Sequence, residues 1–215
     1  TLPEGAIARF PPPSRDGGRL LLSAGHSWNE HCIPDLIEQF EAGDVLVVND
    51  TRVVRARIFG VRETGGRVEF LLLGARGRAI PAMVRPSRKI REGELIWIVD
   101  RTGSKTDQWI RAGTAASDGR REVELSIDAD QMMDLFGSMP LPPYLERDAS
   151  LEDNERYQTV FADEPGAVAA PTASLHLSRE MMANMVKKGV EIHRVTLHVG
   201  PGTFRSLRPV DLDSG

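Results

Sequence analysis

The sequence is poor in cysteine, because Cys32 is the single thiol among 215 residues. An internal disulfide and a zinc site built on several thiolates both need more cysteines, so both are excluded. Proteins without disulfides are typical of reducing compartments. We therefore expect a cytoplasmic protein.

Long apolar runs are also lacking. No stretch approaches the roughly 18 apolar residues that a membrane-spanning helix requires, so we expect no membrane partner. Residues 1–22 show no charged segment followed by an apolar one, which is the pattern of a signal peptide. With 40% hydrophobic and 27% charged residues, the composition is that of a soluble globular chain of one or two domains.

Charge is unevenly distributed along the chain. Residues 52–121 hold 16 Lys and Arg against 7 Asp and Glu, a balance of +9, while the remainder holds 11 against 24, a balance of −13. A basic segment in an acidic chain predicts a surface that faces a polyanion, and arginine suits paired contacts with phosphate. The alternative is that these arginines are the solvated faces of ordinary strands.

The spacing of apolar residues divides the chain into three regions. The first, residues 1–52, contains a short predicted strand at 19–22 and ends in an apolar, β-rich run at 45–48, typical of a strand covered on both faces. Between them, four apolar residues at helical spacing predict a helix that ends at Gly43: Ile33, Leu36, Ile37 and Phe40.

The second region, residues 53–137, predicts consecutive strands followed by one helix. Thr64-Gly65-Gly66 is a hairpin signal between two of the strands. Asp128 and Gly137 suit the two ends of the helix. Its buried side is expected to hold Met132, Met133, Leu135 and Phe136. The six strands, which indicate a small barrel or sandwich, are expected at residues 53–61, 67–73, 79–84, 94–99, 108–111 and 122–127.

The third region, residues 138–215, starts with a stiff connector, since the adjacent Pro142 and Pro143 fit neither a helix nor a central strand. Ser178 suits the start of a helix and Gly189 its end. A strand is predicted over residues 190–199. The apolar side of the helix is expected to hold Met181, Met182, Met185 and Val186.

This order of elements indicates an α/β domain with an inserted all-β, small barrel-like domain. Residues 1–52 and 138–215 then share one sheet, and residues 53–137 form the insert.

Ligands of open α/β sheets bind at the carboxyl ends of the strands. Three such ends are polar or glycine-rich, and they meet in one crevice if the strands are parallel neighbours. They lead into Asn49-Asp50-Thr51-Arg52, into residues 171–176 and into Gly200-Pro201-Gly202-Thr203. The first cluster suits a ribose diol or the orientation of a base; alternatively, its side chains bond their own backbone in an Asx-turn.

Two histidines lie at these ends. His198, on the polar face of the last predicted strand, suits a general acid or base, or else it is structural. His176 precedes a helix start, where backbone N–H groups are able to bind anions. The five histidines show no H-x-E or H-E-x-x-H spacing, so no metal site is predicted. A Walker A loop, a dinucleotide fingerprint and a serine nucleophile elbow are absent as well.

Four long stretches make the sequence resemble one family of tRNA-modifying enzymes. The resemblance is to the S-adenosylmethionine:tRNA ribosyltransferase-isomerases of the queuosine pathway. It is carried, in order, by residues 43–58 (GDVLVVNDTRVVRARI), 139–147 (MPLPPYLER), 155–177 (ERYQTVFADEPGAVAAPTASLHL) and 195–204 (VTLHVGPGTF), with LPEGAIARFPPP from Leu2 also fitting.

The resemblance implies a specific reaction. Such enzymes transfer the ribosyl part of S-adenosylmethionine to 7-aminomethyl-7-deazaguanine at the wobble position of a tRNA and isomerise it, giving epoxyqueuosine with release of adenine and methionine. The implied partners are that tRNA and S-adenosylmethionine as co-substrate, with no metal and no other cofactor, and the implied enzyme is a monomer. The family fold, an α/β domain plus a β-barrel domain, agrees with the organisation predicted above.

The resemblance also gives the candidate residues roles. Proton transfers at carbon, nitrogen and oxygen need acids and bases, for which Asp50, His176 and His198 are the candidates. Asn49, Thr51 and Thr172 are expected to bind hydroxyl groups of the substrate, and Arg52 and Arg55 are expected to bind phosphate near the substrate nucleotide. Tyr157 is expected to stack on a base. Pro171, Gly200, Gly202 and Thr203 are expected to complete the substrate site.

The sequence departs from the family pattern in two respects. Ser174 stands where the family usually has the glycine of AGLHF, which matters if the backbone there is left-handed. Family stretches like GTTSVR and NFHLP do not occur in these 215 residues. We therefore expect an incomplete active site, and the alternative function is that of a diverged or truncated, non-catalytic tRNA-binding relative.

Overall fold

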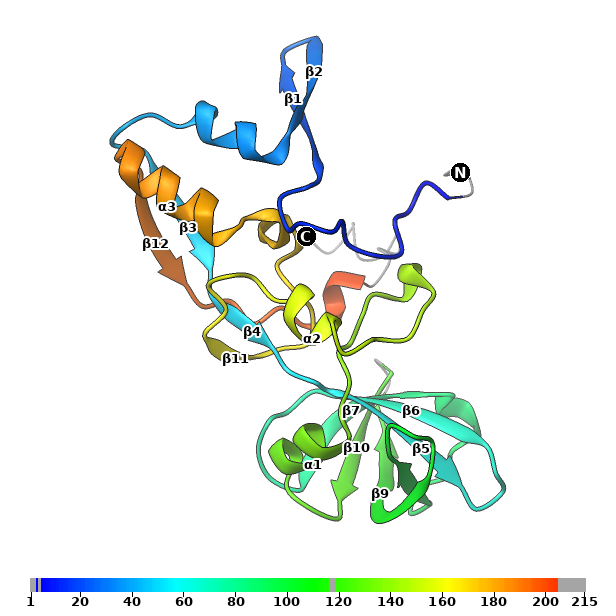
Figure 1. The fold of residues 1–215 in the computed structure, drawn as a ribbon. Coiled ribbons are helices and arrows are strands. Elements are labelled where there is room, and N and C mark those ends of the chain that lie inside the picture. Colours follow the sequence, from blue (N-terminus) through cyan, green and yellow to red (C-terminus); the bar gives the residue numbers. More distant parts are fainter. Residues whose placement is uncertain (1–2, 4, 117–118, 205–215) are drawn as a thin grey trace, which may run out of the picture.

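Two lobes joined by a narrow waist make up the chain in a computed structural model (Figure 1). The structure describes residues 3, 5–116 and 119–204. The lower lobe is a β-barrel, and the upper lobe contains helices and short paired strands. Strand β4 (Thr51–Val53) lies in the upper lobe, and the chain runs directly from it into the barrel.

Six strands close the barrel in the order β10-β7-β6-β5-β8-β9, and every neighbouring pair is antiparallel. Alternate side chains point inward. The inward ones, such as Ile58, Phe70 and Ile96, are completely buried. The expectation of a small barrel is confirmed. Its strands are β5 (Arg57–Arg62), β6 (Arg67–Leu72), β7 (Ala79–Arg85), β8 (Leu95–Val99), β9 (Lys105–Ala115) and β10 (Arg120–Leu125).

Two barrel strands differ in length from the prediction. The predicted strand at 53–61 is in fact two, because β4 pairs with β11 (Glu164–Ala167) outside the barrel and β5 begins at Arg57. Strand β9 is longer than the predicted 108–111. Its polar residues alternate outward on the barrel surface, where an apolar run is not needed to form a strand.

Helix α1 (Ala129–Phe136) lies between Asp128 and Gly137, as predicted. Met132 and Met133 are buried in the barrel core. Leu135 is 61% exposed, so its predicted burial is wrong. A short helix that packs one face against a core leaves part of its surface in solvent.

The upper lobe contains two parallel strand pairs. Strand β3 (Val45–Asn49) pairs with β12 (Glu191–Val195), and β4 pairs with β11. Segments that precede and follow the barrel in sequence thus lie side by side. The last strand stops at Val195, short of the predicted residue 199, because the chain turns to contact Asn49.

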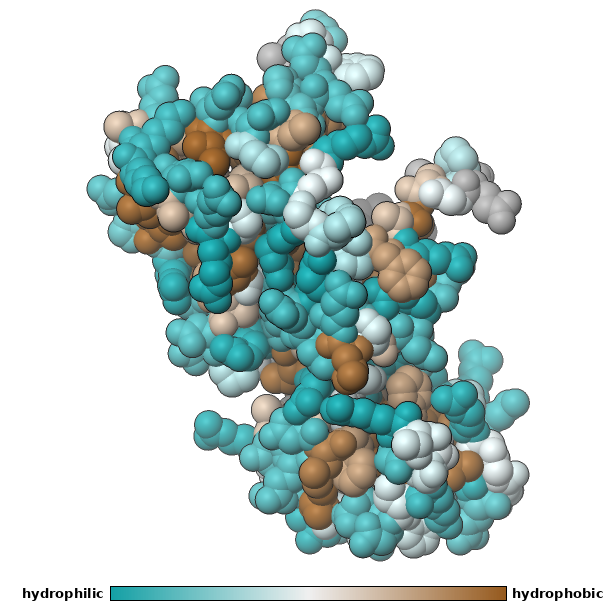
Figure 2. All heavy atoms as spheres, in the orientation of Figure 1, coloured by the Kyte–Doolittle hydropathy of each residue, from teal (hydrophilic) through white to brown (hydrophobic). Residues whose placement is uncertain are grey.

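One face of the β3–β12 pair is covered. Val48 packs with Met181 and Met185 of α3 (Arg179–Lys188) and with Ile33 of η1 (Ile33–Gln39). Val45 and Val47 on the other face are 54% and 58% exposed, so the prediction of a strand covered on both faces is wrong for the described part of the chain. Hydrophobic surface is visible where α3, β3 and β12 lie (Figure 2).

The two ends of α3 agree with the sequence-based prediction, whereas the end of η1 does not. At the start of α3, the Ser178 hydroxyl accepts a hydrogen bond from the Met181 N–H at 3.2 Å, and Gly189 ends the helix with φ of +94°, as predicted. Val186, however, is exposed. The predicted helix at 33–43 is a 3-10 helix that ends at Gln39, while Gly43 lies in a separate turn.

The N-terminal part forms a hairpin of β1 (Arg19–Ala24) and β2 (Ser27–Cys32). Strand β2 was not predicted, because its sequence SWNEHC has no apolar alternation. The remaining helices are short: η2 (Ser87–Lys89), η3 (Pro143–Leu145), α2 (Asp153–Arg156), η4 (Thr172–His176) and η5 (Pro201–Phe204).

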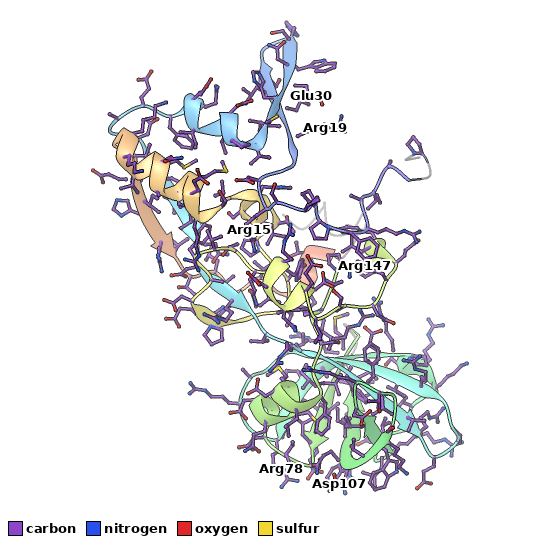
Figure 3. All side chains as sticks on the ribbon, in the orientation of Figure 1. Arg15, Arg19, Glu30, Arg78, Asp107 and Arg147 are labelled. Atoms are coloured by element: carbon purple, nitrogen blue, oxygen red, sulfur yellow. The ribbon has the colours of Figure 1, made fainter. Side chains whose placement is uncertain are left out.

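Arginines fix the segment that precedes this hairpin to the upper lobe (Figure 3). Arg147 donates two hydrogen bonds of 2.7 Å to the buried carboxylate of Asp153 and a third, of 2.6 Å, to the carbonyl of Arg9. Its guanidinium also lies 4.6 Å from the ring centre of Phe10. Arg156 donates to the carbonyl of Pro12 at 2.7 Å. Residues 9–12 of the N-terminal motif therefore contact both the motif at residues 139–147 and the motif at residues 155–177.

Candidate active site

The end of β3 meets the segment that follows β12. The Asn49 amide donates to the Leu197 carbonyl at 2.9 Å, and its oxygen accepts from the Leu197 N–H at 3.0 Å. The same oxygen accepts from the Thr51 N–H at 3.1 Å, which is the Asx-turn that the sequence left open. The Asn49 side chain thus binds backbone groups of Thr51 and Leu197, which fixes the end of β3 to the segment that follows β12.

Asp50 lies next to this clamp and is 8% exposed. The Thr196 hydroxyl donates to its Oδ1 at 2.7 Å. The Asp50 N–H donates to the Val195 carbonyl at 3.0 Å, and its own carbonyl accepts from Asp163 N–H at 2.7 Å. A carboxylate with a fixed backbone and one bonded oxygen is oriented to accept a further hydrogen bond from a ligand.

His198 is joined to the fully buried Thr51. The Thr51 hydroxyl and His198 Nδ1 are 2.8 Å apart, and the tautomer of the imidazole decides which group donates. The side chain of His198 makes no second hydrogen bond within the described residues, and the residue itself is exposed. The ring is therefore held at one nitrogen while the other is accessible to solvent, the arrangement that proton exchange with a ligand needs.

Gly166 of β11 allows the imidazole to occupy this position. A Cβ built on Gly166 would lie 2.7 Å from Cε1 of His198, closer than side chains ever approach. The φ of Gly166 is +156°, which also favours glycine. The sequence gives no signal that singles out this glycine, since the contact joins residues 32 positions apart.

A cavity of about 760 Å³ lies beside this cluster, between the outer face of the barrel and the upper lobe. Pro201 and Gly202, the loop predicted to approach a ligand, line it. The Val168 N–H donates to the Val199 carbonyl at 3.0 Å, which holds the cavity wall against the chain that carries His198. The barrel contributes Arg57, Glu69, Leu71, Leu73, Met83, Arg85 and Arg120, and the upper lobe adds Pro140, Leu141, Pro143 and Val168.

The loop at residues 171–176 packs through Leu175 in the same hydrophobic cluster as Val199. No hydrogen bond, however, joins His176 to Asp50 or His198 in the described part of the chain. The His176 ring instead lies against Gly18, where a Cβ would be 3.1 Å from Nδ1. Hydrogen bonds therefore join two of the three loops, while the His176 ring of the third lies against the N-terminal segment.

Three other candidates already have partners within the protein. Arg55 forms an ion pair of 2.7 Å with Asp134 of α1, and Arg52 donates to the Ala162 carbonyl at 3.0 Å. Tyr157 is 7% exposed, and burial raises the pKa of its hydroxyl. Its ring is not available to a base, so the expectation of stacking is wrong. Tyr157 is instead a core residue whose oxygen accepts from the Ala170 N–H at 3.4 Å.

The remaining candidates lie on the surface or in the cavity wall. Thr172 and Thr203 are exposed, and the Thr203 hydroxyl donates to the Gly200 carbonyl at 3.1 Å, while Pro171 is half-buried. Ser174, in η4, does not have a positive φ, since Glu146 is the one described non-glycine residue that does. Serine thus fits the backbone of η4 in place of the usual glycine.

Two further properties concern the described residues only. No three His, Cys, Asp or Glu side chains among them gather closely enough to hold a metal ion. None of the helices found there is both long and apolar enough to cross a membrane.

Known proteins resemble the chain over nearly its whole length. Residues 1–214 match the family described as queuosine biosynthesis protein. A protein named S-adenosylmethionine:tRNA ribosyltransferase-isomerase from Trichlorobacter lovleyi is 39% identical over 213 residues, and one of the same name from Sorangium cellulosum is 44% identical over 243 residues. These alignments cover 97% and 99% of this chain but 61% and 63% of the relatives, so the chain spans about three fifths of their length.

A solved structure also matches. It is the crystal structure of an S-adenosylmethionine tRNA ribosyltransferase from Thermotoga maritima, 25% identical to this chain, with a TM-score of 0.36. The match covers 93% of this chain and 57% of the other.

Proposed function

Because the chain belongs to the family of queuosine biosynthesis proteins, we propose that it performs the reaction for which its relatives are named. It transfers the ribosyl part of S-adenosylmethionine to 7-aminomethyl-7-deazaguanine at the tRNA wobble position and isomerises it. Epoxyqueuosine in the tRNA, adenine and methionine are the products. The reaction takes place in the cytoplasm and uses no metal, since S-adenosylmethionine itself supplies the reacting group.

One observation carries this proposal. The motifs at residues 43–58 and 195–204 are about 150 positions apart, yet Asn49, Asp50 and Thr51 are hydrogen-bonded to residues 196–198. A carboxylate, an imidazole and two hydroxyls are thereby placed together at the ends of parallel strands, where α/β sheets bind ligands.

Each member of the cluster has a chemical role in the proposal. His198, anchored through Nδ1, moves protons at its accessible nitrogen. The Asp50 carboxylate is the negative group to which the positively charged sulfonium of the donor, or a ribose hydroxyl, binds. Thr51 and Thr196 orient these two side chains and are positioning residues.

The domain arrangement belongs to the same proposal. Residues 1–52 and 138–215 form one α/β domain, and residues 53–137 are a β-barrel domain inserted into it. The parallel pairing of β3 with β12 and of β4 with β11 supports this arrangement, because each pair joins a strand before the barrel to a strand after it. Arg52 and Arg55 lie at the entry to the barrel, and we assign them to the tRNA backbone, where phosphate contacts would replace their bonds to the Ala162 carbonyl and to Asp134.

The test is adenine release from S-adenosylmethionine in the presence of tRNA that carries 7-aminomethyl-7-deazaguanine. We expect His198→Ala to lower the rate by about 10²–10⁴-fold, the usual contribution of a general acid or base. His193→Ala is the matched control, because His193 is exposed on β12 and contacts Glu191 rather than the cluster.

Two outcomes would contradict the proposal. If the wild-type protein releases no adenine but binds the tRNA tightly, the non-catalytic alternative is correct. If His198→Ala and His193→Ala are equally active, the reaction does not depend on this cluster.

A further inference from the structure

The cavity lining has more positive than negative side chains, whereas, among the described residues, the cluster around Asp50 and His198 contains a carboxylate and no arginine. Three arginines, Arg57, Arg85 and Arg120, and one glutamate, Glu69, line it, which leaves a formal charge of +2. Glu69 is already bonded to Arg57, whose Nε donates to it at 2.9 Å. Arg57 and Glu69 thus offset each other, and Arg85 remains as a cationic side chain of the wall.

Arg85 has a well-defined place in the cavity wall. It lies on β7 directly opposite Glu69 of β6, so its side chain starts from the outer face of the barrel beside the Arg57–Glu69 pair. It is exposed and makes no hydrogen bond or ion pair within the described part of the chain. Its planar group of five N–H donors is thus available to an anion, and arginine matches the geometry of phosphate.

The rest of the cavity wall is apolar. Outward residues of β6 and β7, such as Leu71 and Met83, face Leu141 and Val168 of the upper lobe, and the rings of Pro140, Pro143 and Pro201 complete the wall. Apolar walls with a few polar groups are typical of small-molecule sites, and about 760 Å³ lies within their usual range. A flat base fits the apolar part, and a phosphate fits the arginine part.

From this distribution, and resting on the proposed function, we infer that the cavity receives the target nucleotide of the tRNA, not S-adenosylmethionine. Arg85 binds a backbone phosphate next to that nucleotide, and the base lies against the apolar wall. The sulfonium of S-adenosylmethionine is positive, so the Arg85 guanidinium in the cavity wall repels it, whereas a phosphate is attracted. The donor then belongs at Asp50, which directly follows β3, and at His198, which precedes Gly202 of the cavity wall by four positions.

The test compares Arg85→Ala with Arg101→Ala. Arg101 is a matched control, since it is an exposed barrel arginine in the β8–β9 turn, outside the cavity lining, and its loss changes the net charge equally. Affinity for an anticodon stem-loop carrying 7-aminomethyl-7-deazaguanine is measured by fluorescence anisotropy at several salt concentrations, and affinity for S-adenosylmethionine by calorimetry. The phosphates on either side of the target nucleotide are replaced one at a time by uncharged methylphosphonates.

We expect Arg85→Ala to weaken stem-loop binding about 10-fold, to reduce the salt slope by about 1 and to leave the affinity for S-adenosylmethionine unchanged. With one of the two methylphosphonates, the difference between wild type and Arg85→Ala should disappear, because the phosphate that Arg85 binds is then neutral. Arg101→Ala should retain wild-type affinity for both ligands.

The inference is overturned if Arg85→Ala weakens S-adenosylmethionine binding and spares the stem-loop, which makes the cavity the donor site. It is also overturned if Arg101→Ala weakens the stem-loop as much as Arg85→Ala does, since the effect is then one of net charge. Failure of the proposed function gives a different result: wild-type protein then releases no adenine, whatever the two variants do to binding.

Discussion

At the scale of single residues, the rule that ligands bind at strand ends located Asn49, Asp50, Thr51 and His198 correctly in space. The sequence did not reveal how they bond, because the partner of each lies about 150 positions away. The contact of the His176 ring with Gly18 was not predicted either. The surroundings of this ring depend on the N-terminal segment, whose path no local pattern predicts.

Gly166 provides a residue-scale prediction. A Gly166→Ala substitution places a methyl group 2.7 Å from the His198 ring and strains a backbone with φ of +156°, so the imidazole has to move away from Thr51. We expect a loss of stability of about 1–3 kcal/mol, and a larger fall in adenine release than this loss explains at a temperature where the variant is folded. Thermal unfolding and the release assay measure the two effects.

The control for this prediction is Gly66→Ala. A Cβ at Gly66, in the β5–β6 turn, would lie 3.4 Å from Arg62 Cδ, an ordinary contact at the end of a flexible side chain. Activity of Gly166→Ala equal to that of Gly66→Ala would show that the position of the His198 ring does not matter.

At the scale of elements, alternating apolar residues predicted the barrel strands, because a closed barrel with a packed interior requires that alternation. The same criterion failed for β2, which is polar, and for β3, of which one face is exposed. The short helices η3 and η4 contain Pro143 and four weak helix formers, Tyr144, Thr172, Ser174 and His176, so tertiary contacts rather than propensity determine them.

The contact between Arg147 and Asp153 provides an element-scale prediction, since it joins α2 to the proline-rich connector. The hydrogen bonds from Arg147 hold the pKa of the Asp153 carboxyl below its usual 3.8, with burial opposing the shift. A lowered pKa contributes stability at pH values above 3.8, and that contribution is lost as the pH falls through the lower, folded-state value. The free energy of unfolding should therefore fall on acidification below about pH 4.

Asp153→Asn tests this prediction. We expect it to cost about 3 kcal/mol at neutral pH, because it leaves a mostly buried guanidinium without its charged partner, and to remove part of the acid sensitivity. Glu146→Gln is the control, since its ion pair with Arg9 is exposed and should contribute less than about 1 kcal/mol. Urea unfolding from pH 3 to 7 distinguishes the two; parallel profiles for Asp153→Asn and wild type would contradict the prediction.

At the scale of the whole molecule, the two lobes have separate hydrophobic cores. The barrel core consists of inward side chains of its own strands with α1, and Val168 is the only residue of this cluster from outside 53–137 among those described. The upper lobe has two further clusters, around Met185 and around Tyr157. The chain enters and leaves the barrel at adjacent points, since the Ser138 N–H donates to the Arg57 carbonyl at 2.9 Å.

This separation predicts that residues 53–137 fold alone. A closed barrel has no free edge strands, and its interior is filled without the upper lobe. We expect this segment to be monomeric and to unfold cooperatively in urea. Phe70→Ala removes a completely buried ring and should lower the free energy of unfolding of the segment by about 3–5 kcal/mol.

The same substitution in the whole chain should destabilise the barrel transition and leave that of the upper lobe in place, because the two cores share so few residues. Circular dichroism and sedimentation of the segment measure the first expectation. For the second, tryptophan fluorescence is followed in a Trp28→Phe background, because Trp28 lies on β2 and the remaining Trp97 and Trp109 are both in the barrel. A segment that is unfolded in isolation, or a single transition that Phe70→Ala shifts for both lobes together, would show that the barrel depends on the rest of the chain for its stability.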